Sequence, residues 1–380
     1  MTHQDDNRMK RSIVIGVLAV LSVATAAAQA ASRSDWAIVK PAEAGFRADI
    51  GEQIDAAVQA GKAKNLHAVV IVRGGKLVLE RYYEGADQFW AMPIGNVKFG
   101  PHVKHDLRSA TKSVVGLLYS IALAEGKVPA PGQPLLQQFP AYQDLASDPQ
   151  RQRMRVEHAL SMTLGMDWPE DIPYTDSRNP ELGMYLATDP YRFIFDRAVP
   201  TQPGKRWNYN GGATALLGHL IAKGTGKPLF DYAREKLFAP LGIVEVQWVG
   251  GTNGEVSAAS GLRMIPRDFA KLGQLVLNDG RWGNRQVVPA QWLAEVMKPR
   301  ATVSTDGADT IEYGYQWWLV NRSSKQPWKV ARGNGGQTLF VVPSLDLVVA
   351  VMAGNYNATE ASDTPIGIMR GVVLPSLQAK

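Results

Sequence analysis

Two pairs of apolar segments, one near each end of the chain, constrain its fold more than any other feature of the sequence. The first pair covers His67–Arg73 and Lys76–Tyr83, with two glycines between them, which predicts a tight hairpin. The second pair, Thr338–Val342 and Leu347–Met352, flanks Pro343-Ser344-Leu345-Asp346, a sequence typical of turns. Strands at both ends with helices between them predict an α+β fold with one antiparallel sheet assembled from both ends of the chain.

Helical patterns fill much of the chain between and around these strands. Apolar residues recur at helical spacing in Asp49–Gly61, and Ser113–Glu125 is apolar nearly all round, as in a buried helix. Further helices are predicted over Arg155–Leu164, Ala213–Ala222 and Leu229–Leu237, with glycines near their ends. The middle of the chain therefore indicates a mainly helical region inserted into the sheet.

A long segment between Asp167 and Pro203 is rich in Pro, Asp, Tyr and Asn. It is predicted to be a loop, and a loop of this length in a compact domain is often functional. Taken together, these patterns predict a signal peptide over residues 1–30, a sheet domain from residues 31–115 and 250–380, and a helical domain over residues 116–249.

The N-terminus has the layout of a secretory signal peptide. Arg8, Lys10 and Arg11 precede an apolar run over residues 13–28, and an A-x-A pattern ends just before the Ala30-Ala31 bond. We expect cleavage near that bond and a periplasmic or secreted protein with no stable membrane span afterwards. The alternative is an uncleaved membrane anchor, for which the strongly apolar part of the run is short.

Several kinds of chemistry have little support in the composition. The chain has no Cys, which excludes disulfides, a thiol nucleophile and cysteine-based metal sites, and its six His form no H-E-x-x-H pair. We therefore expect no metal and no cofactor. The net charge of +6 comes without a Lys/Arg cluster or a nucleic-acid-binding signature, so we expect no nucleic-acid partner.

The first candidate catalytic motif is Ser109-Ala110-Thr111-Lys112, at the start of the buried helix. Residues at positions i and i+3 share a helix face, so the hydroxyl and the amine can meet. A Lys desolvated by an apolar helix tends to lose its proton, and Lys112 could then accept the proton of Ser109. The alternative is a Ser that caps the helix and a Lys on the surface.

Two later motifs lie in segments that can border a cleft. Trp207-Asn208-Tyr209-Asn210-Gly211-Gly212 precedes a helix, and Tyr209 on this loop could shuttle a proton; the alternative is an ordinary buried Tyr. Gly333-Asn334-Gly335-Gly336-Gln337 leads into a strand, where glycines allow close approach of a ligand to the sheet edge. The alternative for this segment is a simple β-turn.

In this order, the three motifs resemble the serine β-lactamase and penicillin-binding protein superfamily. The likeness is strongest to the β-lactamase-related serine hydrolases, which include class C β-lactamases, esterases, D-Ala-D-Ala carboxypeptidases and 6-aminohexanoate-dimer hydrolase. It extends over about residues 45 to 370. The segments that carry it are His105–Ser113, Leu160–Met166, Pro203–Trp207, Gly261–Asp268 and Val341–Val348. The resemblance implies a β-lactamase/transpeptidase-like fold, with an antiparallel sheet flanked by helices and an all-α domain.

The resemblance also implies roles for individual residues. Ser109 would be the acylated nucleophile, Lys112 its base and Tyr209 the Tyr of the Y-x-N motif. The N–H groups of Ser109 and Gln337 would form the oxyanion hole. The residues expected to contact substrate are Asn334, Gly335, Gly336, Asn210 and, on the long loop, Tyr174.

Two departures from the family pattern narrow the expected chemistry. The Y-x-N motif reads Tyr209-Asn210-Gly211, so Gly replaces its Asn, and Asn210 or Asn208 could substitute. The K-T-G motif reads Asn334-Gly335-Gly336 and lacks its cation. These changes favour a serine hydrolase acting on a small ester, amide or peptide. The alternatives are a D-Ala-D-Ala carboxypeptidase or weak class C-like β-lactamase and, more remotely, a non-catalytic protein that binds the cell envelope.

Overall fold

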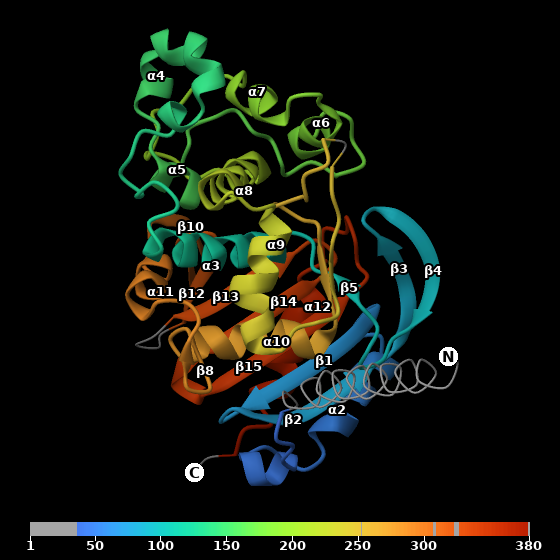
Figure 1. The fold of residues 1–380 in the computed structure, drawn as a ribbon. Coiled ribbons are helices and arrows are strands. Elements are labelled where there is room, and N and C mark those ends of the chain that lie inside the picture. The colour runs from blue at the N-terminus through green and yellow to red at the C-terminus, as the bar shows by residue number, and fades with distance from the viewer. Residues whose placement is uncertain (1–35, 252, 307–308, 323–326, 379–380) are drawn as a thin grey trace, which may run out of the picture. The chain divides into compact units, whose positions relative to one another are not determined.

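The strand pairs from the two ends of the chain lie in one sheet (Figure 1). A computed structural model describes residues 36–251, 253–306, 309–322 and 327–378. Its main sheet is antiparallel throughout and has eight strands in the order β10-β11-β12-β13-β14-β15-β1-β2. Their bounds are β1 Leu66–Arg73, β2 Lys76–Tyr82, β10 Ala301–Asp306, β11 Asp309–Tyr313, β12 Trp318–Arg322, β13 Trp328–Gly333, β14 Gln337–Val342 and β15 Leu347–Ala353. The predicted α+β fold, with an antiparallel sheet drawn from both ends, is confirmed.

Both predicted hairpins are present. Gly74 and Gly75 have φ angles of 59° and 68°, the left-handed conformation that a two-residue turn needs to match the twist of its strands. Between β14 and β15, Pro343–Leu345 forms a short 3₁₀ turn (η6) that ends at Asp346, with φ 48°. Strand β15 pairs with β14 on one side and β1 on the other, and this pairing joins the two ends of the chain.

Three smaller sheets surround the main one. Strands β3 and β4 form a hairpin, β5, β7 and β6 form a three-stranded sheet, and β8 and β9 form a short pair. Their bounds are β3 Glu84–Phe89, β4 Met92–Lys98, β5 His105–Asp106, β6 Val246–Trp248, β7 Leu262–Met264, β8 Arg281–Trp282 and β9 Arg285–Gln286. Three residues separate the end of strand β5 from the first residue of helix α3, so β5 sets the position of the Ser109 motif.

Helices cover the sheet and fill the middle of the chain. The α-helices are α2 Ile50–Gln59, α3 Ala110–Ala124, α4 Pro149–Gln152, α5 Val156–Leu160, α6 Pro180–Leu186, α7 Pro190–Phe195, α8 Gly211–Thr225, α9 Leu229–Ala233, α10 Pro266–Leu277, α11 Ala290–Val296 and α12 Asp363–Gly367. The other short 3₁₀ segments are η1 Pro41–Ala44, η2 Leu136–Gln138, η3 Pro140–Ser147 and η5 Ala239–Leu241. Single π-helical stretches continue two helices, η4 Arg234–Phe238 after α9 and η7 Ile368–Val373 after α12.

Apolar layers cover both faces of the main sheet. On one face, α2 and η7 pack against the sheet in a core that includes Ile50, Ile54, Val69 and Val351. On the other face lie α10 and α3, which contact β15, β14 and β13. A sheet covered on both faces has strands without polar alternation, which explains the continuous apolar run Leu347–Ala353, in which every residue is buried.

Two expectations for the middle of the chain were wrong. The helix predicted over Arg155–Leu164 ends at Leu160, because Met162 adopts a left-handed φ of 60°. The segment predicted as a long loop holds helices α6 and α7. Their first turns are capped by the side chains of Asn179 and Asp189, each followed by Pro, which is a common way to start a helix.

Helices α4 to α8 gather above the sheet in Figure 1. The division into a sheet domain and a helical domain over residues 116–249 stays a prediction. The predicted signal peptide and its cleavage bond lie outside the described residues. Among the residues that the structure does describe, no helix combines the length and the apolar character needed to cross a bilayer.

Candidate active site

Ser109 lies at the junction between strand β5 and helix α3. The preceding residue, Arg108, has a φ of 49°, a left-handed conformation that is uncommon for non-glycine residues and occurs often at functional sites. The backbone of Ser109 is already helical, with φ −63° and ψ −10°, and its side chain caps no backbone N–H of the helix. Ser109 is therefore not a helix-capping residue, and its hydroxyl is available for other contacts.

Lys112 is the first of those contacts. Its Nζ donates hydrogen bonds to Ser109 Oγ at 3.0 Å and to the backbone oxygen of Ala259 at 3.2 Å. The Lys112 side chain is 1% exposed, so it is not a surface lysine. The spacing of the S-x-x-K motif thus brings the hydroxyl and the amine together on one helix face, as expected.

Two buried glutamates complete the surroundings of the Lys112 amine. Glu170 Oε1 lies 3.6 Å from Lys112 Nζ and Glu181 Oε2 lies 3.5 Å away. Both carboxylates are nearly inaccessible to solvent, with exposed fractions of 1% and 2%. Sequence reasoning missed both residues. Glu170 lies in a loop and Glu181 is the second residue of helix α6, and their approach to Lys112 depends on tertiary folding.

The expectation that Lys112 loses its proton by burial was wrong for the resting site. Burial does lower the pKa of Lys112, but electrostatic interactions with Glu181, Tyr209 and Glu170 outweigh that effect and raise the pKa well above its ordinary value. The apolar helix pattern alone does not reveal the two carboxylates that fold against Lys112. Lys112 is therefore an ammonium ion at neutral pH.

The pKa values of the two glutamates are shifted in opposite directions. Burial raises the pKa of Glu181 to about 7, with a further rise from Glu170, although Lys112 lowers it. The pKa of Glu170 is lowered: burial raises it, but Lys112, a hydrogen bond with Glu181 and the backbone N–H of Gly211 outweigh that effect. Glu170 also accepts hydrogen bonds from Trp168 Nε1 at 2.8 Å and Tyr174 Oη at 2.9 Å. Glu181 is consequently the carboxyl group that takes up a proton near neutral pH.

Tyr209 lies against both members of the S-x-x-K motif. Lys112 Nζ is 4.8 Å from the centre of its ring, and its phenol hydrogen-bonds with Ser109. Burial raises the pKa of Tyr209, so the phenol keeps its proton at neutral pH. The rings of Trp207 and Trp318 lie 6.1 and 5.7 Å from the Tyr209 ring, centre to centre, and hold it beside Lys112.

Gly211 explains why the expected Asn of the Y-x-N motif is missing. A Cβ atom at this position would lie 2.4 Å from Glu181 Oε2 and 3.0 Å from Glu170 Oε2, too close for any side chain to fit without displacing these carboxylates. The backbone N–H of Gly211 also donates to Glu170. In this chain, the glutamate pair occupies the space that a side chain at position 211 would need.

Neither neighbouring asparagine replaces that Asn. The Asn210 side chain is 2% exposed and caps helix α8, where its Oδ1 accepts from the N–H of Ala213 at 2.9 Å. Asn208 Nδ2 donates to the backbone oxygens of Met166 and Trp168. The expectation that Asn210 contacts substrate is therefore corrected: its oxygen serves the helix end.

The glycine-rich segment lies directly beside Ser109. A Cβ on Gly333, the last residue of β13, would come within 3.1 Å of the Ser109 nitrogen. Gly335 and Gly336 have φ angles of 94° and 99°, which favour glycine. Asn334 borders the pocket described next, and its side chain exchanges hydrogen bonds with Asn357. The assignment of the oxyanion hole to the N–H groups of Ser109 and Gln337 stays a prediction.

A cavity of about 340 Å³ opens above Ser109. It is lined mainly by apolar and aromatic residues, with Ser109 and Glu181 in its wall: Trp90, Ala91, Arg108, Ser109, Tyr174, Glu181, Leu182, Tyr185, Leu186, Gly250, Gly251, Ser260 and Asn334. Of these described residues, Arg108 is the one cation. Its guanidinium donates to Gln88, pairs with Asp106 at 3.3 Å and stacks over Tyr356 at 4.6 Å. The Arg108 charge is thus already paired within the protein.

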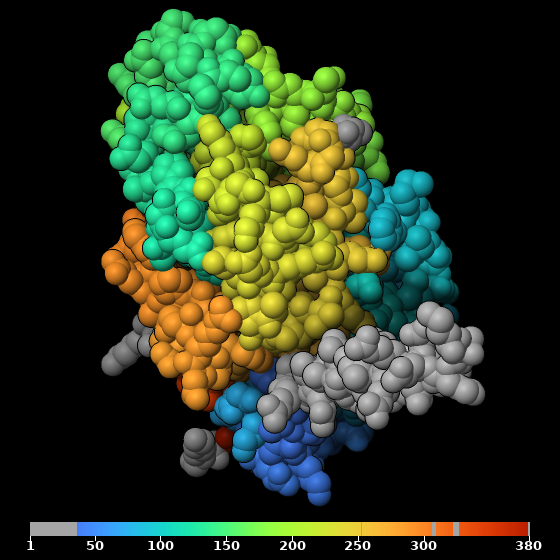
Figure 2. Space-filling view, viewed as in Figure 1, coloured from blue at the N-terminus to red at the C-terminus, as the bar shows by residue number. Residues whose placement is uncertain are grey.

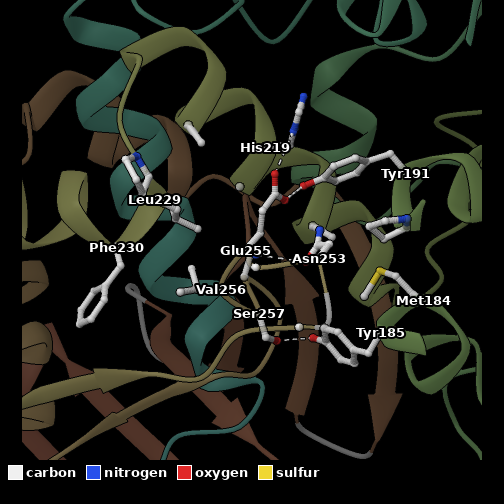
Figure 3. A pocket seen from close by; sticks show the side chains of 18 of the residues that line it. Met184, Tyr185, Tyr191, His219, Leu229, Phe230, Asn253, Glu255, Val256 and Ser257 are labelled. Atoms are coloured by element: carbon white, nitrogen blue, oxygen red, sulfur yellow. Dashed lines mark hydrogen bonds and ion pairs between the residues drawn. The ribbon is translucent and has the colours of Figure 1, made fainter. Parts of the chain in front are cut away.

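A second cavity of about 350 Å³ lies behind Tyr185. Figure 3 shows Tyr185 beside Ser257 at one end and Tyr191, His219 and Glu255 at the other. Because Tyr185 lines both cavities, its ring forms part of the wall between them. Sequence reasoning did not identify this cavity.

Comparison with known proteins gives the family of the chain. The model of the family described as Beta-lactamase matches residues 54–366. The chain belongs to the β-lactamase family. This β-lactamase-family chain is 23% identical over 308 residues to 6-aminohexanoate-dimer hydrolase from Paenarthrobacter ureafaciens, a match that covers 75% of this chain and 72% of the relative.

Solved structures share the fold of this β-lactamase-family protein. One is EstCE1, described as a hydrolase with promiscuous acyltransferase activity, with a TM-score of 0.68 and 14% identity over 85% of this chain and 98% of that one. Another is the octameric penicillin-binding protein homologue from Pyrococcus abyssi, with a TM-score of 0.64 and 18% identity over 85% of this chain and 78% of that one. The β-lactamase/transpeptidase-like fold implied by the motifs is confirmed, and the chain is a hydrolase of the serine hydrolase class.

Proposed function

We propose that this chain cleaves ester or amide bonds through an acyl-enzyme on Ser109. The observation that carries the proposal is the 3.0 Å hydrogen bond between Lys112 Nζ and Ser109 Oγ at the edge of an apolar cavity. Activation of a hydroxyl by an adjacent base is the usual way to make a serine nucleophilic. Membership of the β-lactamase family supports the same chemistry.

The buried glutamates give Lys112 a route to act as a base although it rests as an ammonium ion. In the first step, Lys112 passes a proton to the Glu181 carboxylate, 3.5 Å away. The neutral amine then takes the proton of Ser109 as its oxygen attacks the carbonyl carbon of the substrate. The carbonyl oxygen becomes an oxyanion, held by the N–H groups of Ser109 and Gln337.

Breakdown of the tetrahedral intermediate needs a proton for the leaving group. The Tyr209 phenol keeps its proton because burial raises its pKa, and it hydrogen-bonds with Ser109. From there the phenol donates its proton to the departing nitrogen or oxygen and regains a proton from Lys112. Water then attacks the acyl-enzyme by the same proton route in reverse and releases the acid.

The cavity supports a substrate with an apolar acyl or leaving group. Among the described residues that line it, the one cation is Arg108, which is paired with Asp106 and stacked on Tyr356. The Arg108 guanidinium is therefore not positioned to hold the carboxylate of a β-lactam or a D-Ala-D-Ala peptide. We place short esters and linear amides first among substrates, and the likeness to 6-aminohexanoate-dimer hydrolase supports the amides. The layout of residues 1–30 supports a further proposal, that the enzyme is exported.

A substrate panel tests this proposal. We expect a p-nitrophenyl butyrate and the linear dimer of 6-aminohexanoate to be hydrolysed with kcat/KM at least about tenfold higher than a cephalosporin or a D-Ala-D-Ala peptide, which corresponds to about 1.4 kcal/mol in barrier height. Initial rates measured at equal enzyme concentration give the comparison. Hydrolysis confined to the cephalosporin or the D-Ala-D-Ala peptide would contradict the proposed substrate class.

The pH dependence tests the role of Glu181. Because its pKa is raised to about 7, its carboxylate accepts a proton above that pH and is already protonated below it. We expect kcat/KM of the wild-type enzyme to rise as the pH increases through about 7. Glu181→Gln should abolish this pH-dependent rise and lower kcat/KM at pH 8 by about a hundredfold, typical of lost acid–base catalysis. Asp176→Asn is the control, because that half-buried carboxylate pairs with Arg178. An unchanged pH profile in Glu181→Gln would exclude this proton route.

A further inference from the structure

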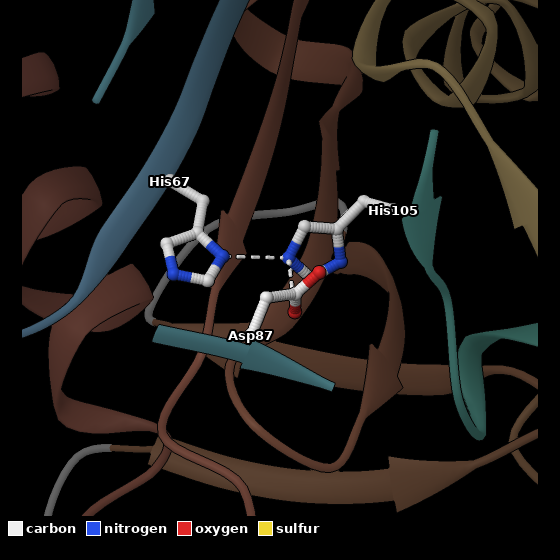
Figure 4. Close-up of side chains that lie close together, drawn as sticks. All are labelled: His67, Asp87 and His105. Carbon is white, nitrogen blue, oxygen red and sulfur yellow. Dashed lines mark hydrogen bonds and ion pairs between the residues drawn. The ribbon is translucent and has the colours of Figure 1, made fainter. Parts of the chain in front are cut away.

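Two histidines and an aspartate from three different sheets meet in the interior (Figure 4). His67 lies on β1, Asp87 on β3 and His105 on β5. Their exposed fractions are 0%, 4% and 0%. One nitrogen or oxygen atom from each lies within 4.8 Å of the other two. Sequence reasoning did not connect these residues, because they lie on separate strands with no metal-ligand spacing.

The hydrogen bond of His105 to the backbone determines which of its nitrogens carries a proton. His105 Nδ1 lies 2.9 Å from the backbone oxygen of Asp106. A carbonyl oxygen can only accept, so Nδ1 must be the donor. A neutral imidazole has one N–H, and Nε2 of His105 therefore presents a lone pair.

The same reasoning applies to His67. Asn65 Nδ2 donates to the backbone oxygen of Ala86 at 2.9 Å, which orients the amide so that Asn65 Oδ1 faces His67 Nε2 at 3.2 Å. Because Oδ1 can only accept, His67 Nε2 carries the proton. Nδ1 of a neutral His67 then also presents a lone pair.

The two lone pairs point at each other. His67 Nδ1 and His105 Nε2 are 2.8 Å apart, and Asp87 Oδ1 lies 3.7 Å from His105 Nε2. Three electron-pair donors thus converge without a proton between them, an arrangement that requires a cation.

We propose that His67 Nδ1, His105 Nε2 and Asp87 bind a divalent transition metal ion, with zinc the first candidate. Two imidazoles and a carboxylate form a donor set typical of zinc. With metal–nitrogen bonds of about 2.0–2.1 Å, two nitrogen ligands of a tetrahedral zinc ion lie about 3.3–3.4 Å apart. The two ring nitrogens, now 2.8 Å apart, would therefore separate by about 0.5 Å on binding. The outer N–H groups, held by Asn65 and Asp106, orient the rings as the outer partners of metal-bound histidines do.

The surroundings hold the site in this arrangement. Phe99 stacks on the His67 ring, with ring centres 4.2 Å apart. A Cβ on Gly85 would lie 2.7 Å from His67 Nε2, and one on Gly354 would lie 2.5 Å from His67 Cε1. Glycine is required at both positions because any side chain there would displace the ring.

A metal at this position would join three sheets next to the active site. His105 lies on the strand that leads to Ser109, and the turn of the β3–β4 hairpin carries Trp90 and Ala91, which line the cavity above Ser109. The ion would therefore stabilise the framework of the site without taking part in acyl transfer. This inference departs from the sequence-based expectation of no metal.

Metal analysis of the untagged full chain tests the proposal. After dialysis against a chelator and re-equilibration with Zn²⁺, we expect about one tightly bound ion per chain by elemental mass spectrometry, and a melting temperature several degrees above that of the chelated protein. His67→Gln and His105→Gln should each lose the ion. His219→Gln is the matched control, because His219 also faces a carboxylate, Glu255 at 3.8 Å, but has no second histidine ligand; it should retain the ion.

Two results would overturn the proposal. One is wild-type protein that binds no Zn²⁺ and whose melting temperature does not respond to it, which would leave a shared proton as the cation. The other is undiminished binding in both His67→Gln and His105→Gln. If these variants do not fold, Co²⁺ bound to the wild-type chain decides the question: visible absorption bands of a nitrogen-ligated site support the proposal, and the spectrum of aqueous Co²⁺ contradicts it.

Discussion

Replacement of Ser109 by Ala should lower kcat/KM by about ten-thousandfold or more, as expected when the nucleophile of a cooperating group of catalytic residues is removed. The variant keeps Lys112 and the glutamate pair but has no oxygen to form the ester. Initial rates on a p-nitrophenyl ester give the comparison.

Ser113→Ala is the matched control for this substitution. Ser113 lies one turn further along α3 and is buried, and its hydroxyl donates to the backbone oxygen of Gln316 at 2.8 Å. Its loss should cost about 1 kcal/mol of folding stability and leave kcat/KM within a few-fold of wild type. A Ser109→Ala variant with more than about a tenth of wild-type activity, which is less than 1.4 kcal/mol in barrier height, would contradict the assignment.

Lys112→Arg should lower kcat/KM by about a thousandfold or more, because a guanidinium stays protonated and cannot take the proton of Ser109. The larger head group also has to fit between two carboxylates that lie 3.5 and 3.6 Å from the Lys112 amine. Rates and melting temperature are measured together, so that a loss of catalysis is separated from a loss of folding.

Lys271→Arg provides the control for that experiment. Lys271 is also buried on a helix, 5% exposed, and pairs with Asp268 at 2.8 Å three residues earlier. This substitution should leave kcat/KM within a few-fold of wild type. Near-normal turnover in Lys112→Arg would mean that another group deprotonates the serine.

Much of the fold could be predicted from the sequence because its signals are local. The strands of the two hairpins have bounds within one residue of those expected, since apolar runs and the Gly74-Gly75 turn determine them over short distances. Helices α6 and α7 were missed although Asn179-Pro180 and Asp189-Pro190 are good starting signals. The high content of Pro and Asp in this segment was interpreted as a loop, whereas it marks helix ends.

The contact within a single helix could be predicted from the sequence, whereas the contacts made by tertiary folding could not. The contact between Ser109 and Lys112 follows from a three-residue spacing. Glu170 and Glu181 reach Lys112 only through tertiary folding. Without them, the pKa of the Lys112 amine was expected to be lowered, whereas it is raised. Likewise, the buried cluster of His67, Asp87 and His105 depends on contacts among three sheets, which no sequence spacing indicates.

Covalent trapping tests the acyl-enzyme most directly. The wild-type chain is incubated with a fluorophosphonate. The mass of the intact protein gives the number of adducts, and the peptide masses after proteolytic digestion locate them. If Ser109 forms the acyl-enzyme, we expect one adduct per chain, on the peptide that contains Ser109, and none in Ser109→Ala. An adduct on another residue, or labelling of Ser109→Ala to the wild-type level, would contradict this role of Ser109.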